Sequence, residues 1–317
     1  MPHAHGFGNT FTSRFLAILM PFFLGSCSGP NAIPQWFDAV HRLPVHTVLV
    51  QDHRIAYLDV GHGSPVILIH GYGGSLWQWE YQQGPLSAEH RVITLDLLGS
   101  GFSDKPDLEY TPAILLDSFR RFMDALNIPH ASLVGNSMGA GLAIAMAVSD
   151  PERVDRVVLI SGFPERIREK LSSPMMRRAI DSRTPVWLVK FGNWLLGRGI
   201  TDQVLSEMVH DHSLLTPTVL DRSYRNRKRS GLIEVLLSLS RNLQLWEDGF
   251  AKRLGEMHQP TLILWGERDK VFPPKVGQDL QALVPGAAFE LIPEAGHIPM
   301  WERPDLVNPL LLKFLQP

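Results

Sequence analysis

The stretch "VGNSMGAG" (Val134–Gly141) places Ser137 between two glycines. The apolar run before the serine, Ala131–Val134, predicts a short buried strand. The alanine-rich run after it, Met138–Val148, predicts a buried helix that ends at an Asp-Pro pair. Ser137 therefore falls at a sharp strand-to-helix corner, where the G-x-S-x-G pattern exposes a serine hydroxyl as a nucleophile.

A nucleophilic serine needs a base within hydrogen-bond reach and an acid that orients the base. His297 lies in "LIPEAGHIPMWERP", directly after the last predicted strand, and Asp269 lies in "TLILWGERDKVFPP", directly after the strand before it. The order Ser137, Asp269, His297 is the one expected for this arrangement on a doubly wound sheet. We therefore predict a catalytic triad of these three residues.

Acyl transfer also needs an oxyanion hole of two backbone N–H groups. We assign the first to Met138, which follows Ser137 at a helix N-terminus. We assign the second to Tyr72 in the loop "ILIHGYGGSLWQW", whose glycines permit a close approach of the backbone. His70 of the same loop is predicted to be structural, because one base is sufficient.

Alternating and buried apolar runs predict an α/β fold. Two alternating runs, Thr47–Val50 and Arg54–Val60, predict an antiparallel hairpin. Further runs that predict buried strands are Val66–Ile69, Val92–Leu95, Ala131–Val134, Val157–Ile160, Thr261–Trp265 and Ala288–Ile292. Because helical stretches separate these strands, we expect a mostly parallel sheet with helices on both faces.

The rhythm of strands stops over residues 163–257, where only helical patterns occur. We predict a helical insertion there, with the core formed by residues 44–162 and 258–317. Within the insertion, Pro185–Arg198 presents one apolar helix face. That face consists of Trp187, Phe191, Trp194 and Leu195. We expect it to pack into the core, with pocket lining as the alternative.

Bulk composition excludes some classes of partner. The 317 residues are 44% hydrophobic, enough for a sizeable core, and 30 Lys and Arg nearly balance 32 Asp and Glu. No charge excess therefore points to nucleic acid. The basic run of Arg225, Arg227, Lys228 and Arg229 is interpreted as a solvated face.

The N-terminus has the layout of a secretory signal peptide. Residues 1–14 carry Arg14 and no acid, and Phe15–Leu24 is apolar but too short to span a bilayer. The following Gly-Ser-Cys resembles a bacterial lipobox ending at Cys27, which is the only cysteine, so no intramolecular disulfide forms.

This layout predicts cleavage after residue 26, which would leave a lipidated Cys27 at the mature N-terminus. The protein would then be an exported lipoprotein tethered to a membrane. Residues 27–43 are predicted to form a linker or a short helix. Pro21 interrupts the apolar run, and the basic region is weak. The alternative is an N-terminal extension on a cytoplasmic protein.

Together these motifs resemble those of the α/β-hydrolase superfamily over residues 44–316. The matching motifs are H-G-Y-G-G at His70, D-x-x-G-x-G-x-S at Asp96–Ser103, G-N-S-M-G at Gly135, and the Asp269 and His297 loops. The resemblance implies an eight-stranded sheet and a helical cap over the active site, inserted after the sixth strand.

Subfamilies of this fold differ at the nucleophile. Haloalkane dehalogenases and epoxide hydrolases carry aspartate where this chain has Ser137, which disfavours both. Hydrolases of carbon–carbon bonds in ring-fission products often carry G-N-S-M-G, but their oxyanion loop is usually richer in glycine than His70–Gly74.

We therefore expect a serine hydrolase of small apolar carboxylic esters that acts through an acyl-enzyme and needs no metal or organic cofactor. The alternatives are a carbon–carbon bond hydrolase and a non-catalytic binding protein on the same fold.

Overall fold

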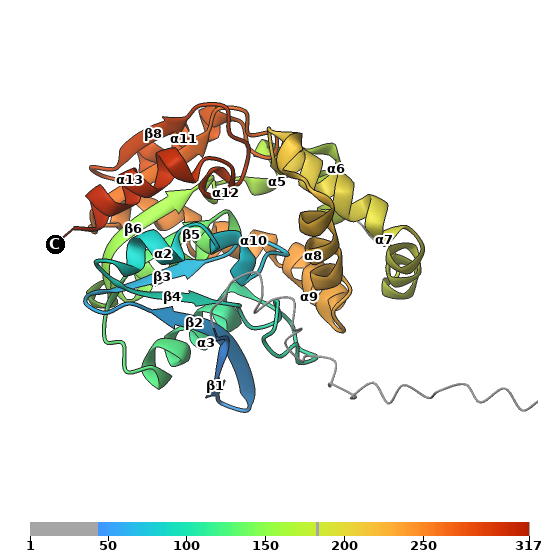
Figure 1. Ribbon diagram of the computed structural model, residues 1–317, viewed down its shortest axis with the longest axis horizontal. Helices are drawn as coiled ribbons and strands as arrows, with labels where there is room; N and C mark the ends of the chain where they lie inside the picture. Colours follow the sequence, from blue (N-terminus) through green and yellow to red (C-terminus); the bar gives the residue numbers. More distant parts are fainter. Residues whose placement is uncertain (1–43, 182–183, 317) are drawn as a thin grey trace, which may run out of the picture.

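The computed structural model describes residues 44–181 and 184–316 (Figure 1). The predicted signal peptide, the lipidated Cys27 and the linker before residue 44 lie outside these residues. Among the described helices, none combines the length and the apolar character needed to cross a bilayer.

An eight-stranded sheet with the order β1-β2-β4-β3-β5-β6-β7-β8 forms the centre of the molecule. The strands are β1 (His46–Val50), β2 (His53–Val60), β3 (Pro65–Ile69), β4 (Arg91–Leu95), β5 (Ala131–Asn136), β6 (Val154–Ile160), β7 (Thr261–Gly266) and β8 (Ala288–Ile292). β2 pairs antiparallel with both β1 and β4, and all pairs from β4 to β8 are parallel. The predicted fold class is confirmed.

Both faces of the sheet are buried, because alternate side chains of a strand point to opposite sides. In β3, Ile67 and Ile69 join one hydrophobic cluster while Val66 and Leu68 join another. The first cluster includes α3 (Pro112–Ala125), α4 (Met138–Ser149) and α11 (Pro274–Leu283); the second includes α2 (Gln83–Ser87), α12 (Pro299–Glu302) and α13 (Pro304–Leu315). Two short 3₁₀ turns, η1 (Leu76–Trp79) and η2 (Pro151–Arg153), complete the core connections.

Between β6 and β7 the described residues form only helices, which gather at one side of the sheet (Figure 1). They are α5 (Ile167–Lys170), α6 (Pro174–Asp181), α7 (Val186–Met208), η3 (His212–Leu214), α8 (Pro217–Arg227), α9 (Leu232–Arg241), α10 (Leu243–Gly249) and η4 (Ala251–Glu256). The last of these, η4, contacts the core helix α4. The boundaries 163 and 257 for a cap stay a prediction.

Helix α7 contradicts the expectation that its aromatic face packs into the core. Trp187 is 70% exposed and Trp194 is 65% exposed, and Phe191 and Leu195 are exposed too. The buried positions of α7 are instead Asn193, Gly197, Thr201 and Leu205. The prediction was wrong because α7 is apolar on more than one side, so its strongest stripe does not identify its inner face.

A buried ion pair fastens α8 to the core. Arg222 is 4% exposed, and its guanidinium donates to both carboxylate oxygens of Glu80 at 2.9 and 2.8 Å. Trp301 Nε1 donates to the same carboxylate at 2.8 Å, and the guanidinium lies 4.9 Å from the centre of the Trp77 ring. One carboxylate therefore joins α8, α12 and the turn that follows η1.

We expect Arg222→Met to lower the free energy of unfolding by about 3–5 kcal/mol, because Glu80 keeps its charge in a buried place and loses its cation. Chemical denaturation at neutral pH measures this loss. The double variant Glu80→Gln/Arg222→Met should recover part of it, since no unpaired charge remains. Wild-type stability of Arg222→Met would contradict the anchoring role.

Candidate active site

Ser137 occupies a strained corner between β5 and α4. Its φ of 52° and ψ of −116° lie in a region that costs a non-glycine residue about 1–3 kcal/mol. A Cβ on Gly135 would lie 2.3 Å from the Gly139 carbonyl oxygen, and one on Gly139 would lie 2.2 Å from the Ile69 carbonyl oxygen. Only glycine therefore fits on either side of the serine, as the G-x-S-x-G pattern requires.

His297 and Asp269 form a buried pair. His297 Nδ1 lies 2.9 Å from Asp269 Oδ2, while Asp269 Oδ1 accepts the N–H groups of Val271 at 2.8 Å and Phe272 at 3.0 Å. The backbone thus fixes the carboxylate, and the carboxylate favours a proton on Nδ1. Nε2 of His297 is left as the basic nitrogen.

Ser137 and His297 line one cavity, together with Tyr72 and Met138. Among the contacts of the described residues, no hydrogen bond joins Ser137 Oγ to His297. Such catalytic hydrogen bonds are often loose without substrate. Of the five residues predicted for the triad and the oxyanion hole, four therefore line one cavity, and Asp269 lies behind His297. Their catalytic roles stay predictions.

The two predicted oxyanion donors keep their amides available. Within residues 44–181 and 184–316, neither the Tyr72 nor the Met138 N–H donates to a protein group. The Tyr72 hydroxyl donates to the Leu236 carbonyl at 3.0 Å and lies 2.9 Å from Ser240 Oγ. Burial raises the pKa of Tyr72 to about 12, so its neutral phenol ties the oxyanion loop to α9.

Two polar side chains that were not predicted from the sequence hold the His297 loop. The first is Asn136, which directly precedes the serine and whose Nδ2 donates to the carbonyls of Ile160 and His297, each at 3.1 Å. Its place inside the quoted motif was a signal, but its partner lies 161 residues away in sequence.

The second is Glu302. Its carboxylate accepts the N–H of Gly296 at 2.7 Å, of His210 at 2.6 Å and of Asp211 at 3.2 Å. Burial raises the pKa of this carboxyl group. The residues just after α7 and the residue before His297 therefore share one acceptor.

His70 has the contacts of a structural histidine. Its Nε2 accepts the Leu97 N–H at 3.1 Å, and its Nδ1 lies 2.8 Å from the Gly71 carbonyl oxygen. Burial lowers the pKa of His70, which keeps the ring neutral. Among the described residues, no group of His, Cys, Asp and Glu is arranged to hold a metal ion.

The cavity measures about 470 Å³ and is mostly apolar. Aliphatic and sulfur-containing side chains from α6, α7 and α9 form much of its wall. Examples are Met175, Met176, Val204, Leu232 and Leu236. The space has the size and character of a small-molecule site.

One cation stands out on the cavity wall. Arg227 Nε donates to Asn193 Oδ1 at 2.6 Å, and among the described side chains no carboxylate forms an ion pair with Arg227. Burial lowers the pKa of Arg227, yet an arginine remains charged at neutral pH. A half-buried cation without a counter-ion would favour an anionic group in the cavity.

The comparisons with known proteins agree with this geometry. The family model of the α/β-hydrolase fold matches residues 64–304, and the chain belongs to this family. The chain is 32% identical over 274 residues to a 2-hydroxy-6-oxo-6-phenylhexa-2,4-dienoate hydrolase of Burkholderia cepacia, covering 84% of this chain and 92% of the relative.

Two solved structures are similar. A meta-cleavage product hydrolase from Pseudomonas fluorescens gives a TM-score of 0.74 at 28% identity, covering 86% of this chain and 97% of that one. The enol-lactonase from Burkholderia xenovorans gives a TM-score of 0.70 at 26% identity, and the match covers 85% of this chain and 99% of the enol-lactonase. The chain is therefore a hydrolase of the α/β-hydrolase family.

Ser137→Ala should lower kcat by about 10⁴–10⁶-fold, because no other group supplies the nucleophile. A fluorophosphonate probe should label the wild type covalently and leave the variant unlabelled. Ser132→Ala, in β5 just before this corner and also buried, is the matched control and should label normally. Strong residual turnover of a folded Ser137→Ala protein would contradict the role.

Glu302→Gln should lower kcat by about 10–100-fold with little change in KM, because an amide NH₂ cannot accept the N–H groups and the His297 loop shifts. Steady-state kinetics separate kcat from KM, and a thermal melt reports any general loss of stability. An unchanged kcat in the folded variant would show that Glu302 does not position His297.

Proposed function

We propose that this protein is a serine-dependent hydrolase that cleaves a carbon–carbon bond next to a ketone in an acidic, largely apolar ring-fission product. Arg227 carries this proposal, because it puts an unpaired cation on the wall of an apolar cavity that also holds Ser137 and His297. The relative from Burkholderia cepacia acts on a dienoate, which combines an acid group, a ketone and an apolar phenyl end.

The triad would act on the ketone in three steps. Ser137 Oγ adds to the carbonyl carbon while His297 Nε2 takes its proton, and the N–H groups of Tyr72 and Met138 stabilise the oxyanion. In the keto tautomer of the dienoate the carbon beside the ketone is tetrahedral, so when the carbon–carbon bond breaks its electron pair passes into the conjugated keto acid. The protonated His297 then gives that carbon the proton it took from Ser137. Water activated by His297 finally releases the acyl group from Ser137.

Arg227 would contribute through charge. The leaving carbon is a poor leaving group unless its electrons spread over a conjugated acid. A guanidinium that binds the carboxylate orients the substrate and stabilises this developing charge.

Ester hydrolysis is the second candidate, and the apolar cavity wall and the likeness to an enol-lactonase favour it. The same triad and oxyanion donors would serve both reactions, with an alkoxide in place of the carbon leaving group. The substrate would then be a small apolar ester. A non-catalytic role would leave Ser137 unreactive toward a fluorophosphonate.

The deciding experiment compares 2-hydroxy-6-oxo-6-phenylhexa-2,4-dienoate with a series of p-nitrophenyl esters of rising acyl length, with Ser137→Ala as the background. Faster serine-dependent turnover of the dienoate supports carbon–carbon cleavage. Ester turnover with a chain-length optimum and no dienoate cleavage would move the function to ester hydrolysis.

Arg227→Gln should raise the KM for the dienoate about 10–100-fold, the loss expected for a charge-assisted hydrogen bond, and should affect a neutral ester much less. Arg225→Gln, an exposed change on the same helix that does not reach the cavity, is the matched control. Equal losses on both substrates would indicate that Arg227 supports the cavity wall rather than the acid group.

Export and lipidation remain a separate proposal from the N-terminal sequence. Mass spectrometry of the mature N-terminal peptide tests it: a diacylglyceryl group on Cys27 supports the tether, and an unmodified peptide that begins upstream of Cys27 excludes it.

A further inference from the structure

The outward face of α7 is an exposed apolar surface. Its large side chains are Val186, Trp187, Leu188, Phe191, Trp194, Leu195 and Leu196, which we call the α7 outer face. Seven neighbouring exposed apolar residues on one helix are unusual, because the surfaces of monomeric proteins rarely carry large contiguous apolar patches. A helix that is apolar on both sides is normally covered on both.

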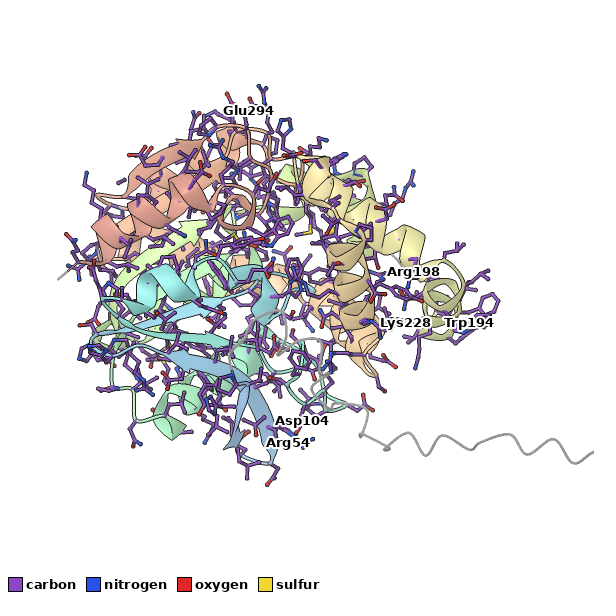
Figure 2. All side chains as sticks on the ribbon, in the orientation of Figure 1. Arg54, Asp104, Trp194, Arg198, Lys228 and Glu294 are labelled. Atoms are coloured by element: carbon purple, nitrogen blue, oxygen red, sulfur yellow. The ribbon has the colours of Figure 1, made fainter. Side chains whose placement is uncertain are left out.

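Basic side chains border this face. Figure 2 shows Trp194, Arg198 and Lys228 together at one edge of the molecule. Arg198 and Lys228 both lie over the Tyr224 ring, at 4.8 and 5.4 Å from its centre.

The nearby acid does not cancel this positive charge. Arg198 and Arg225 share the single carboxylate of Asp221, at 3.0 and 2.6 Å. Lys190 of α7 is paired with Glu234 of α9 at 2.6 Å. The excess positive charge therefore comes from Arg198, Arg225 and Lys228 against Asp221. The α7 outer face therefore combines tryptophan, phenylalanine and leucine with a net positive border.

The opposite side of the same helix reaches the active-site cavity. Val189, Ile200 and Val204 of α7 line the cavity that contains Ser137. Helix α7 therefore lies between the active-site cavity and the α7 outer face. A surface that covers the outer face would be separated from a bound substrate by this one helix.

We propose that the α7 outer face docks on a bilayer that contains anionic lipid, with α7 lying parallel to the membrane surface. Exposed aromatic and aliphatic side chains bordered by Lys and Arg are typical of surfaces that bind at a membrane interface. The docked enzyme would take apolar substrates that partition into lipid.

Charge favours a bilayer over a second copy of the chain. A symmetric dimer through this face would bring the same patch of each copy together, so Arg198 and Lys228 would approach their own counterparts. Anionic headgroups would instead neutralise these cations. This proposal is independent of the bond that the enzyme cleaves and of the predicted lipid on Cys27.

A fluorescent probe placed on α7 tests the docking locally. The full chain carries Cys27→Ser and Phe191→Cys, with an environment-sensitive nitrobenzoxadiazole dye on the new thiol. It is mixed with phosphatidylcholine vesicles containing about a quarter phosphatidylglycerol. We expect a blue shift, a rise in intensity, and quenching by lipids with a nitroxide on the acyl chain.

The matched control carries the dye at Leu49→Cys, an exposed apolar position in β1, which lies far from α7 in Figure 1. Its dye should stay in water. If the N-terminal segment alone held the chain on vesicles, the dyes at both positions would remain unquenched, and that result would overturn the proposal.

The double substitution Trp187→Ser/Trp194→Ser removes two large apolar side chains that would be buried in the bilayer. It should raise the lipid concentration that gives half of the maximal fluorescence change of the dye at Phe191→Cys about tenfold or more. Leu49→Ser/Leu283→Ser removes exposed apolar groups elsewhere and should change nothing. Turnover of a water-soluble substrate should be the same in all variants, which shows that they are folded. A response that depends on protein rather than lipid concentration would indicate a second copy on this face and reject the bilayer.

Discussion

The strained backbone of Ser137 is the constraint on which the rest of the site depends. Its positive φ is held because β5 is paired on both sides and because the Ser137 N–H donates to the Ile160 carbonyl of β6 at 2.9 Å. The absence of a Cβ at Gly135 and Gly139 lets α4 begin directly against β3. Packing of the sheet thus aims the hydroxyl at the cavity, and Asn136 links the same corner to the His297 loop.

Among the polar contacts that join the helices between β6 and β7 to the core, three involve residues near the site. The Tyr72 hydroxyl bonds to α9, and Arg222 of α8 pairs with Glu80. Glu302 accepts N–H groups from the residues after α7 and from the His297 loop. The cavity is therefore shaped by contacts between segments far apart in sequence. Because function lies in the site and not in the fold, differences in such a wall can adapt one fold to different reactions.

The same helices carry two further features of this chain. Arg227 brings a cation to the cavity wall, and α7 exposes large apolar side chains on its outer face. Without a ligand or a partner, both features cost free energy. The charge of Arg227 is partly removed from water, and the large apolar side chains of α7 remain exposed to water. An acid group in the cavity and a lipid surface against α7 would each relieve one of these costs.

The sequence by itself determined the sheet, because each strand is a short apolar run that alternates with helices, and it located Ser137, Asp269 and His297 because each follows the end of a predicted strand. It did not reveal the roles of Asn136 or Glu302, whose partners are backbone groups that only folding brings near. It also assigned the wrong face of α7 to the core, because periodicity finds an apolar stripe but not the neighbour that covers it. Tertiary structure alone decided which side of α7 lines the cavity, since the polar Asn193 is held inside by its hydrogen bond to Arg227.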